Sequence, residues 1–189
     1  FLENGAFAKQ SLTADIGGNT INIPSNDLIS LYPKEILGGR LFYTYGYRCP
    51  LEVIIVDTFG GQDSSLQVHP TAGYNQDNFN HPYSHNESYY ILDTTDESIT
   101  YFGIKDEVNC CQTKKGDYFL IPAGLVHAFG KGTVCLEIDT NPITTFKMWD
   151  WNRVGEDGQP RPIDLDLAKE VIQDEFKETW VNENLIPKP

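Results

Sequence analysis

The fold that we predict for this chain is decided by one stretch of sequence, Gly116-Asp-Tyr-Phe-Leu-Ile-Pro122-Ala-Gly124-Leu-Val-His127. It contains a short apolar run, Tyr118–Ile121, then a Pro-x-Gly turn, and then a second run, Val126–Phe129. Short apolar runs separated by proline and glycine are typical of strands joined by tight turns. The stretch therefore predicts two strands, with His127 near the start of the second.

Similar apolar runs recur along the chain from Leu41 onward, where the pattern turns from loop-like to β. Turn residues separate them at fairly regular intervals, which is typical of a β-sandwich or a small barrel. Residues 1–30 are rich in Asn, Gly, Ser and Thr, and we expect loops with short strands there. The other predicted strands are Leu51–Phe59, Ser88–Leu92, Ile99–Ile104 and Thr133–Ile138.

The clearest helix lies near the end of the chain. The segment Leu165–Glu178 places Leu167, Val171 and Phe176 near one face at helical spacing. Asp164 precedes it as the expected N-cap. We therefore predict an all-β protein with a few peripheral helices, the clearest at 165–178.

Composition excludes some classes of function. The chain has 189 residues, which suits one domain with its own core. Its formal net charge of -13 argues against nucleic acid as a partner, because phosphate backbones bind basic surfaces. A small anionic ligand stays open, since a few local cations outweigh a distant acidic surface. No apolar run reaches the roughly 18 residues of a membrane span, so we expect no membrane partner.

The chain has four cysteines: Cys49, Cys110, Cys111 and Cys135. They lack the CxxC spacing of zinc ribbons and redox motifs. The neighbours Cys110 and Cys111 are poorly placed to bridge to each other. We expect four reduced thiols in a cytoplasmic protein, because disulfides are rare in that compartment.

Two histidines and one carboxylate have the residue types of a divalent-metal site. Gln67 and His69 are two residues apart, so on a strand their side chains leave from the same face. Glu87 precedes an apolar run, and His127 belongs to the stretch quoted above. Imidazoles with carboxylate and amide oxygens bind such ions and leave a position for water or substrate. Each residue alone also fits a structural histidine or a solvated carboxylate.

The order and spacing of these residues resemble a known family. The run G-x5-P-x-G-x2-H from Gly116 to His127 matches the second motif of the cupins. Gln67 stands where the first cupin motif has a histidine, and this Gln-x-His variant resembles the type I phosphomannose isomerases. Further similar segments are Asn86–Ile91, Lys115–Gly132, Leu136–Ile138, Thr144–Arg153 and Asp157–Arg161. The chain is thus identified as a member of this family, which implies a cupin-type β-barrel, or jelly roll.

The resemblance also implies a set of site residues. Gln67, His69, Glu87 and His127 would bind one zinc ion per chain, with other divalent metals possible. Glu137 matches a family glutamate close to the metal. Because its strand alternates apolar and polar residues, Glu137 faces either the barrel cavity or the solvent.

Three departures from the family bear on the reaction. Lys147 stands where the family has a catalytic arginine, and it keeps the charge without the planar bidentate fork. Thr71–Tyr74 replaces the acidic or lysine-containing residues usual after His-Pro. The family usually has a helical insertion before the Lys-x-Gly-Asp strand, and this chain has only Lys105–Lys114 at that place. These changes leave the predicted metal residues intact.

Three functions follow from these residues. The resemblance implies a zinc-dependent aldose–ketose isomerase that interconverts mannose 6-phosphate and fructose 6-phosphate or a related sugar phosphate. Lys147 and Glu137 would be its catalytic residues. The departures keep open a non-catalytic or regulatory sugar-binding metal cupin. Two histidines plus a carboxylate also fit an Fe(II) cupin oxygenase, although Gln67 counts against it.

Other features have plainer interpretations. His81 and His85 flank Tyr83, and we expect both to be solvated loop residues rather than a second metal site. Arg153 and Arg161 would bind a phosphate or pair with a surface carboxylate.

The predicted domain organisation has three parts. A lead-in arm over 1–35 packs on a barrel over 36–163 that holds the metal site. A C-terminal helix and tail over 164–189 follow.

Overall fold

The computed structural model describes residues 11–47, 51–104, 108–140 and 144–176. The chain divides into two compact units, Phe1–Glu52 and Val53–Pro189. The predicted arm over 1–35 and its packing on the barrel stay predictions. None of the helices in the described ranges has the length and apolar character needed to cross a membrane.

The first unit contains a hairpin and three short helices. Gly17 and Gly18 join the two strands with φ of 59° and 83°, the left-handed conformations that a tight hairpin turn requires. The predicted turn to β structure at Leu41 is wrong, because Leu41 lies in a helix whose end Gly46 closes by donating to Phe42 O at 2.8 Å. The elements are β1 (Ser11–Ile16), β2 (Asn19–Pro24), α1 (Ser25–Leu31), α2 (Pro33–Leu37) and α3 (Gly39–Tyr45).

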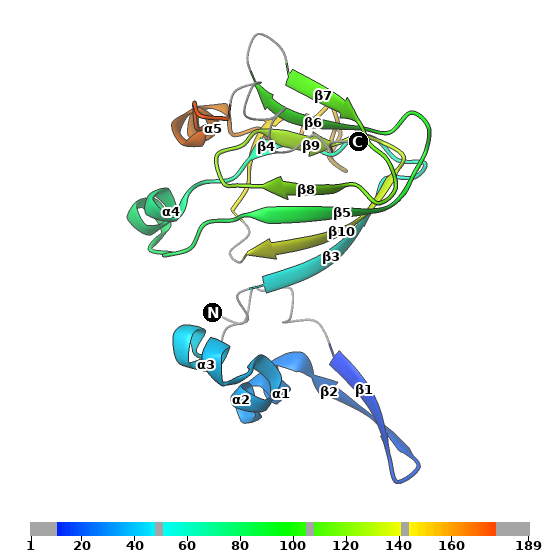
Figure 1. The fold of residues 1–189 in the computed structure, drawn as a ribbon, viewed down its shortest axis with the longest axis vertical. Coiled ribbons are helices and arrows are strands. Elements are labelled where there is room, and N and C mark those ends of the chain that lie inside the picture. Colours follow the sequence, from blue (N-terminus) through cyan, green and yellow to red (C-terminus); the bar gives the residue numbers. More distant parts are fainter. Residues whose placement is uncertain (1–10, 48–50, 105–107, 141–143, 177–189) are drawn as a thin grey trace. The chain divides into compact units, whose positions relative to one another are not determined.

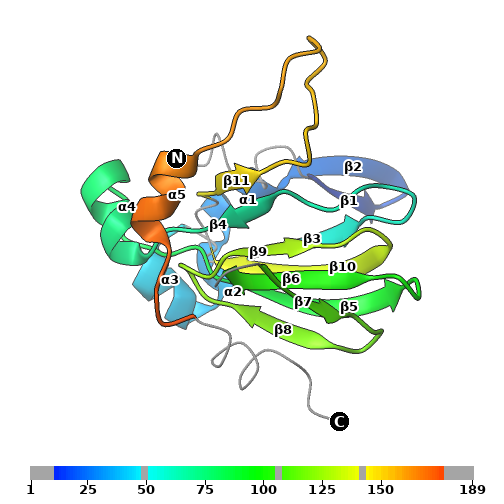
Figure 2. The ribbon, with the colours of Figure 1, turned by 90° about the horizontal axis from the view of Figure 1, so that it is seen from above.

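The second unit is built from two antiparallel sheets (Figures 1 and 2). The first has the order β3 (Leu51–Asp57), β10 (Thr133–Thr140), β5 (Glu87–Thr94) and β8 (Tyr118–Ile121). The second has the order β11 (Phe146–Trp149), β4 (Leu66–Val68), β9 (His127–Phe129), β6 (Ile99–Ile104) and β7 (Val108–Gln112). The predicted all-β architecture with a few peripheral helices is confirmed, with the bounds of β6 and β8 as predicted.

The core lies between these sheets. Tyr89 and Phe119 come from the first sheet and Phe102 from the second, and all three are almost completely buried. Along β5 burial alternates, so that Glu87, Tyr89 and Ile91 face inward. This two-residue period carries a glutamate into the barrel interior on the same face as the core.

Helix α5 (Leu165–Val171) is shorter than predicted. Ile172 has an extended backbone with φ −60° and ψ 131°, so the helix ends there instead of continuing to Glu178. Gln173 N then donates to Gly124 O at 3.1 Å. A Cβ at Gly124 would lie 2.2 Å from the Gln173 side chain, and Gly124 has φ +92°. Because Gly124 has no side chain, the segment after α5 can pack directly against the Pro-x-Gly turn.

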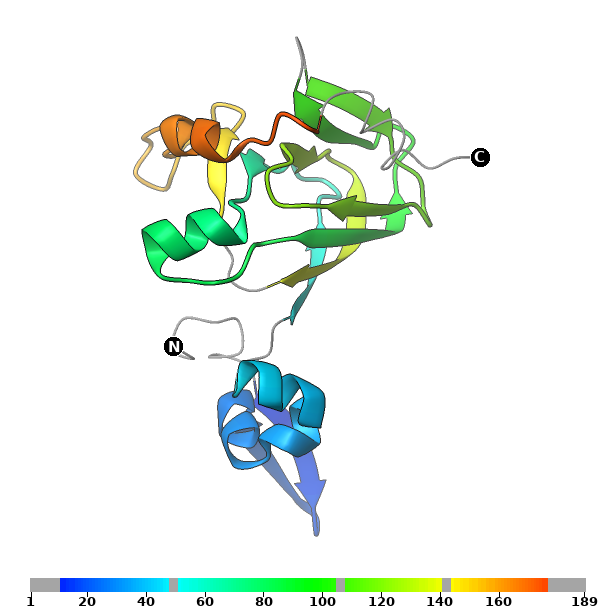
Figure 3. The ribbon, with the colours of Figure 1, turned by 60° about the vertical axis from the view of Figure 1, so that its left-hand side comes forward.

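Helix α4 (Ala72–Phe79) was not predicted from the sequence. Its apolar residues show no helical period, but its ends are closed: Thr71 Oγ1 accepts from Tyr74 N, and Asn80 adopts a left-handed φ of 52°. Helices α4 and α5 lie at the same end of the barrel (Figures 1 and 3), where Tyr74 Oη donates to Glu170 Oε2 at 2.8 Å. The departure Thr71–Tyr74 therefore starts a helix in this chain.

Candidate metal centre

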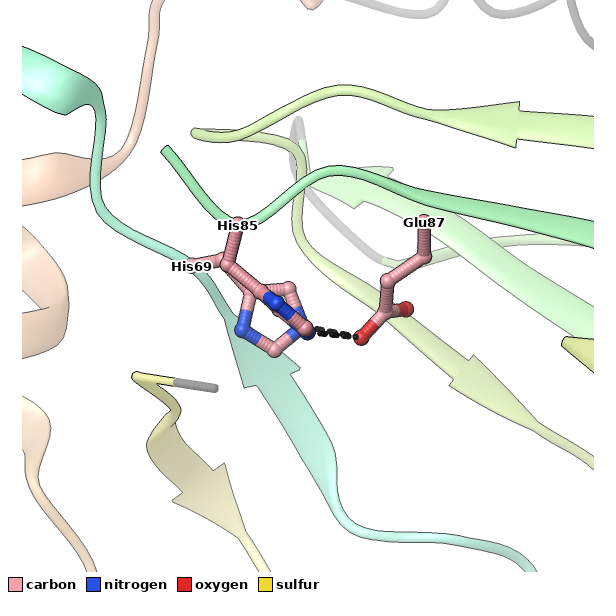
Figure 4. Close-up of side chains that lie close together, drawn as sticks. All are labelled: His69, His85 and Glu87. Atoms are coloured by element: carbon pink, nitrogen blue, oxygen red, sulfur yellow. Dashed lines mark hydrogen bonds and ion pairs between the residues drawn. The ribbon is translucent and has the colours of Figure 1, made fainter. Parts of the chain in front are cut away.

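Glu87, at the start of β5, is the centre of a buried cluster of histidines. Its side chain is only 2% exposed, and three imidazole nitrogens approach its two oxygens. His69 Nε2 lies 2.6 Å and His85 Nε2 2.9 Å from Glu87 Oε1 (Figure 4), and His127 Nε2 lies 3.2 Å from Oε2. The buried hydroxyl of Tyr89 donates to Oε2. The carboxylate is thus held in place from both sides.

The opposite nitrogen of each imidazole lies within hydrogen-bond distance of a backbone carbonyl. His69 Nδ1 is 2.9 Å from Thr144 O, His85 Nδ1 is 2.7 Å from Thr140 O, and His127 Nδ1 is 2.9 Å from Leu125 O. A carbonyl only accepts, so each Nδ1 carries the hydrogen. The neutral form of such a ring turns an unprotonated Nε2 toward Glu87. Histidines that bind metals are oriented in the same way.

The protonation of the cluster follows from its burial. Burial lowers the pKa of His69 to about 4, so its ring is neutral at physiological pH. Burial alone would raise the pKa of Glu87, but His127 and His69 outweigh it and hold that pKa well below its usual value. Burial would lower the pKa of His85, but the hydrogen bond to Glu87 outweighs it and raises that pKa.

These donors fit a divalent cation. Among the described residues, His69 Nε2 has no hydrogen-bond partner, although an ionised carboxylate oxygen lies 2.6 Å away. Two electron-rich atoms at that distance repel each other unless a cation lies between or beside them. Imidazole nitrogen and carboxylate oxygen are ligands that zinc and iron accept.

Gln67 and Lys147 lie beside His127 on the second sheet. Gln67 pairs with His127 across β4 and β9, and Lys147 pairs with Gln67 across β11 and β4. Directly paired residues project from the same face of a sheet. Gln67 Nε2 lies 3.4 Å from His127 Nε2, and its Oε1 accepts from Ser65 Oγ at 3.0 Å. The structure thus brings Gln67, His69, Glu87 and His127 together, with Lys147 half-buried on the same face.

Lys147 is also held through its backbone. Its N–H donates to Asp164 Oδ2 at 3.1 Å, and Asp164 N donates to Lys147 O at 2.6 Å. Asp164 does occupy the N-cap position of α5, but its side chain makes no capping hydrogen bond to the helix. The Asp164 carboxylate instead accepts a hydrogen bond from the backbone of β11.

Two further carboxylates lie next to Glu87. Asp139 pairs with Glu87 and Glu137 pairs with Tyr89 across β10 and β5. Glu137 is 8% exposed, which places it on the inward face. Oxygens of Glu87, Glu137 and Asp139 lie within 4.8 Å of one another. Burial, together with Glu137 and Glu87, raises the pKa of Asp139 to about 9, so it is protonated at neutral pH.

The expectation that His85 is a solvated loop residue is wrong. His85 is 1% exposed, and its ring meets that of His69 edge-on at a centroid distance of 4.2 Å. One feature of the sequence pointed to it: His85 is two residues before Glu87, so in extended chain both leave from one face. His81 is only half-buried and is not part of this cluster.

Arg153 and Arg161 share one carboxylate. Arg153 Nη2 contacts Asp150 Oδ1, and Arg161 Nε lies 3.1 Å from Asp150 Oδ2. Asp150 is 4% exposed. Of the two expected roles, pairing with a carboxylate is therefore the one observed, and this carboxylate is buried.

Three of the four cysteines lie within the described residues. Cys110, Cys111 and Cys135 are free thiols, and Cys49 lies outside the described residues. Burial raises the pKa of Cys111 to about 11, which makes its thiol a poor nucleophile at neutral pH.

Comparisons with known proteins place the chain near one group of isomerases. No family model matches. The chain is 33% identical to the probable mannose-6-phosphate isomerase GmuF of Bacillus subtilis over 158 residues, which covers 73% of this chain and 47% of that protein. It is 35% identical to the mannose-6-phosphate isomerase ManA of Bacillus subtilis over 145 residues, which covers 68% and 45%. The chain thus spans about half the length of these relatives.

Solved structures of the same kind share the fold. The mannose 6-phosphate isomerase from Bacillus subtilis superposes with a TM-score of 0.74 at 24% identity, covering 89% of this chain and 57% of that one. A zinc-bound mannose 6-phosphate isomerase superposes with a TM-score of 0.73 at 14% identity, covering 98% and 69%. The predicted cupin-type barrel is confirmed by this likeness.

Proposed function

Because the chain belongs to the phosphomannose isomerase family, we propose that it is a metal-dependent aldose–ketose isomerase acting on a sugar phosphate. Mannose 6-phosphate and fructose 6-phosphate are the pair to test, since the relatives carry the name of that reaction. The observation that carries the proposal is the buried Glu87 with imidazole nitrogens of His69 and His127 directed at it.

Gln67, His69, Glu87 and His127 would hold the metal, with zinc as the first candidate at one ion per chain. The ion, when bound, supplies a Lewis acid beside the sugar's reacting oxygens. The donors support this assignment because His69 and His127 keep Nδ1–H on backbone carbonyls and turn Nε2 inward. For Gln67, rotation of the amide would turn its oxygen toward the same point.

The chain's own residues would move the proton. Isomerisation takes a proton from C2 of the aldose, forms an enediol and returns a proton to C1. Glu137 would accept and return that proton, because it is a carboxylate on the inward face within reach of Glu87. Asp139 is protonated beside it and shares a hydrogen bond with it. Lys147 would place its ammonium near the developing oxyanion.

The test is a coupled assay for conversion of mannose 6-phosphate by the protein loaded with zinc, stripped with chelator, and reloaded. Turnover that disappears on stripping and returns with zinc would support the proposal. Turnover that is insensitive to the metal would contradict it. Restoration by iron alone, with consumption of oxygen, would favour the oxygenase.

A second candidate is a sugar-binding cupin without turnover. Lys147 favours it, because an ammonium lacks the bidentate fork of the arginine that the resemblance implies. Calorimetric titration with mannose 6-phosphate would separate the two functions. Binding without conversion at any metal loading would favour the second.

A further inference from the structure

We propose that His85 is a direct ligand of the metal, in addition to the four residues named above, which brings the imidazole ligands to three. This inference rests on the metal centre proposed above and adds a residue to it that the sequence did not assign. It does not depend on which sugar the protein isomerises, or on whether it turns one over.

Distances place the His85 nitrogen where a ligand would lie. His85 Nε2 and His69 Nε2 approach the same oxygen, Glu87 Oε1, at 2.9 and 2.6 Å. The three ligand atoms lie within 4.8 Å of one another. Nitrogen and oxygen ligands bind zinc at about 2.0–2.2 Å, so two donors on one ion lie at most about 4.4 Å apart. Small movements bring all three onto one ion.

The ring of His85 is oriented as firmly as those of the other two histidines. His85 Nδ1 lies 2.7 Å from Thr140 O. The backbone of Thr140 is itself tied to the segment before β5, because Thr140 N donates to Asn86 O at 2.8 Å and Asn86 N donates to Thr140 Oγ1 at 2.8 Å. These bonds turn Nε2 toward Glu87, as Leu125 O does for His127.

Burial favours a ligand over a solvated base. His85 and His69 are each 1% exposed and pack edge-on, so no water is needed to explain the position of either ring. His85 Nε2 and Glu87 Oε1 lie 2.9 Å apart. A bound cation would accept a lone pair from each of these two atoms.

Gln67 is less available than His85. Its Oε1 already accepts from Ser65 Oγ at 3.0 Å, and its amide nitrogen faces His127. Gln67 would join His69, His85, Glu87 and His127 only after its amide rotates. Three nitrogens favour zinc, cobalt or nickel over magnesium, which prefers oxygen ligands.

The test counts the histidines bound to cobalt. In protein loaded with Co²⁺, each ligating imidazole keeps its Nδ1–H on a buried carbonyl, and paramagnetic proton NMR detects that hydrogen as a strongly shifted, exchangeable signal. We expect three such signals in wild type and two in His85→Gln. Cobalt affinity in His85→Gln should fall by more than about 100-fold, because a residue that only supports a ligand usually contributes about 10- to 100-fold.

Controls separate the possible outcomes. His81→Gln, four residues earlier and outside the cluster, should keep three signals, and Gln67→Ala should keep three as well. Circular dichroism verifies that His85→Gln is folded. Two signals in wild type, or three that persist in His85→Gln, would overturn the proposal, as would a protein that binds no cobalt. Three signals without any isomerase activity would leave His85 as a ligand and remove only the proposed reaction.

Discussion

The two sheets of the barrel contribute chemically different walls to the candidate site. The sheet of β3, β10, β5 and β8 contributes carboxylates: Glu87, Glu137 and Asp139. The sheet of β11, β4, β9, β6 and β7 contributes the amide and ammonium of Gln67 and Lys147 and the imidazole of His127. Buried carboxylates cost free energy unless cations or hydrogen bonds compensate them. The difference between the walls shows why a cation between them is expected.

His85 departs from this division. It precedes β5 on the carboxylate side, yet it contributes a nitrogen. Substitutions in one sheet at a time test how the two walls of the site depend on each other. Their expected effects on metal binding, activity and stability differ in size.

The largest effect is expected from Glu87→Gln, which removes the negative charge at the centre of the histidine cluster. Stoichiometric metal should be lost, as it should in His69→Ala and His127→Ala, because each change removes a ligand from a buried site. Elemental analysis after desalting measures this. Glu97→Gln is the matched control, since the Glu97 side chain is 79% exposed. Full occupancy in Glu87→Gln or in both histidine variants would rule out this metal centre.

Glu137→Gln should keep the metal and lose the reaction. A neutral amide cannot accept the proton from C2, and loss of a general base typically costs about 100- to 10,000-fold in kcat. The coupled assay measures the rate, and elemental analysis shows whether the metal stays. If the rate in Glu137→Gln equals that in Glu97→Gln, another group is the base.

Lys147→Ala should lower kcat and kcat/KM together, with little change in KM, because the ammonium matters most in the transition state. Loss of such a charged stabiliser costs on the order of 100-fold or more. Lys147→Arg should retain or raise activity, and the exposed Lys115→Ala is the control. Wild-type activity in Lys147→Ala would contradict the role.

Chelation should destabilise the barrel without unfolding it. A ligand at about 1,000 times its Kd adds about 4 kcal/mol to the free energy of unfolding, and the carboxylates lose that compensation when it leaves. The β core between the sheets is large enough to persist. Tm should fall while the circular dichroism spectrum stays β-rich. Complete unfolding on chelation at room temperature would show that the metal is required for folding.

Asp139 is expected to change how stability depends on pH in chelated protein. Its pKa is about 9 when folded and about 3.9 in an unfolded chain. The unfolded state therefore loses this proton first as pH rises, and the side chain costs stability progressively between pH 4 and 9. Asp139→Asn should match wild type near pH 4 and be more stable at pH 8 in denaturant titrations. Equal pH dependence in both proteins would show that Asp139 is already ionised.

Much of the site could be predicted because it depends on local spacing. Gln67 and His69 at two residues apart, and His127 after Pro-x-Gly, are readable from strand and turn patterns. His85 could be read only in combination with Glu87, since a histidine in an irregular segment has no periodic neighbours. The helix α4 was missed because its stability comes from caps and not from an apolar face.

The sequence by itself determined where the central strands run and which side chains alternate inward, because a strand has a fixed period of two residues. It also determined that Glu137 had two possible faces. Only the tertiary structure decided that it faces inward, that His85 reaches Glu87, and that Arg153 and Arg161 are held by Asp150. These contacts depend on the register between strands and on burial in a shared interior, which join segments that no local pattern relates.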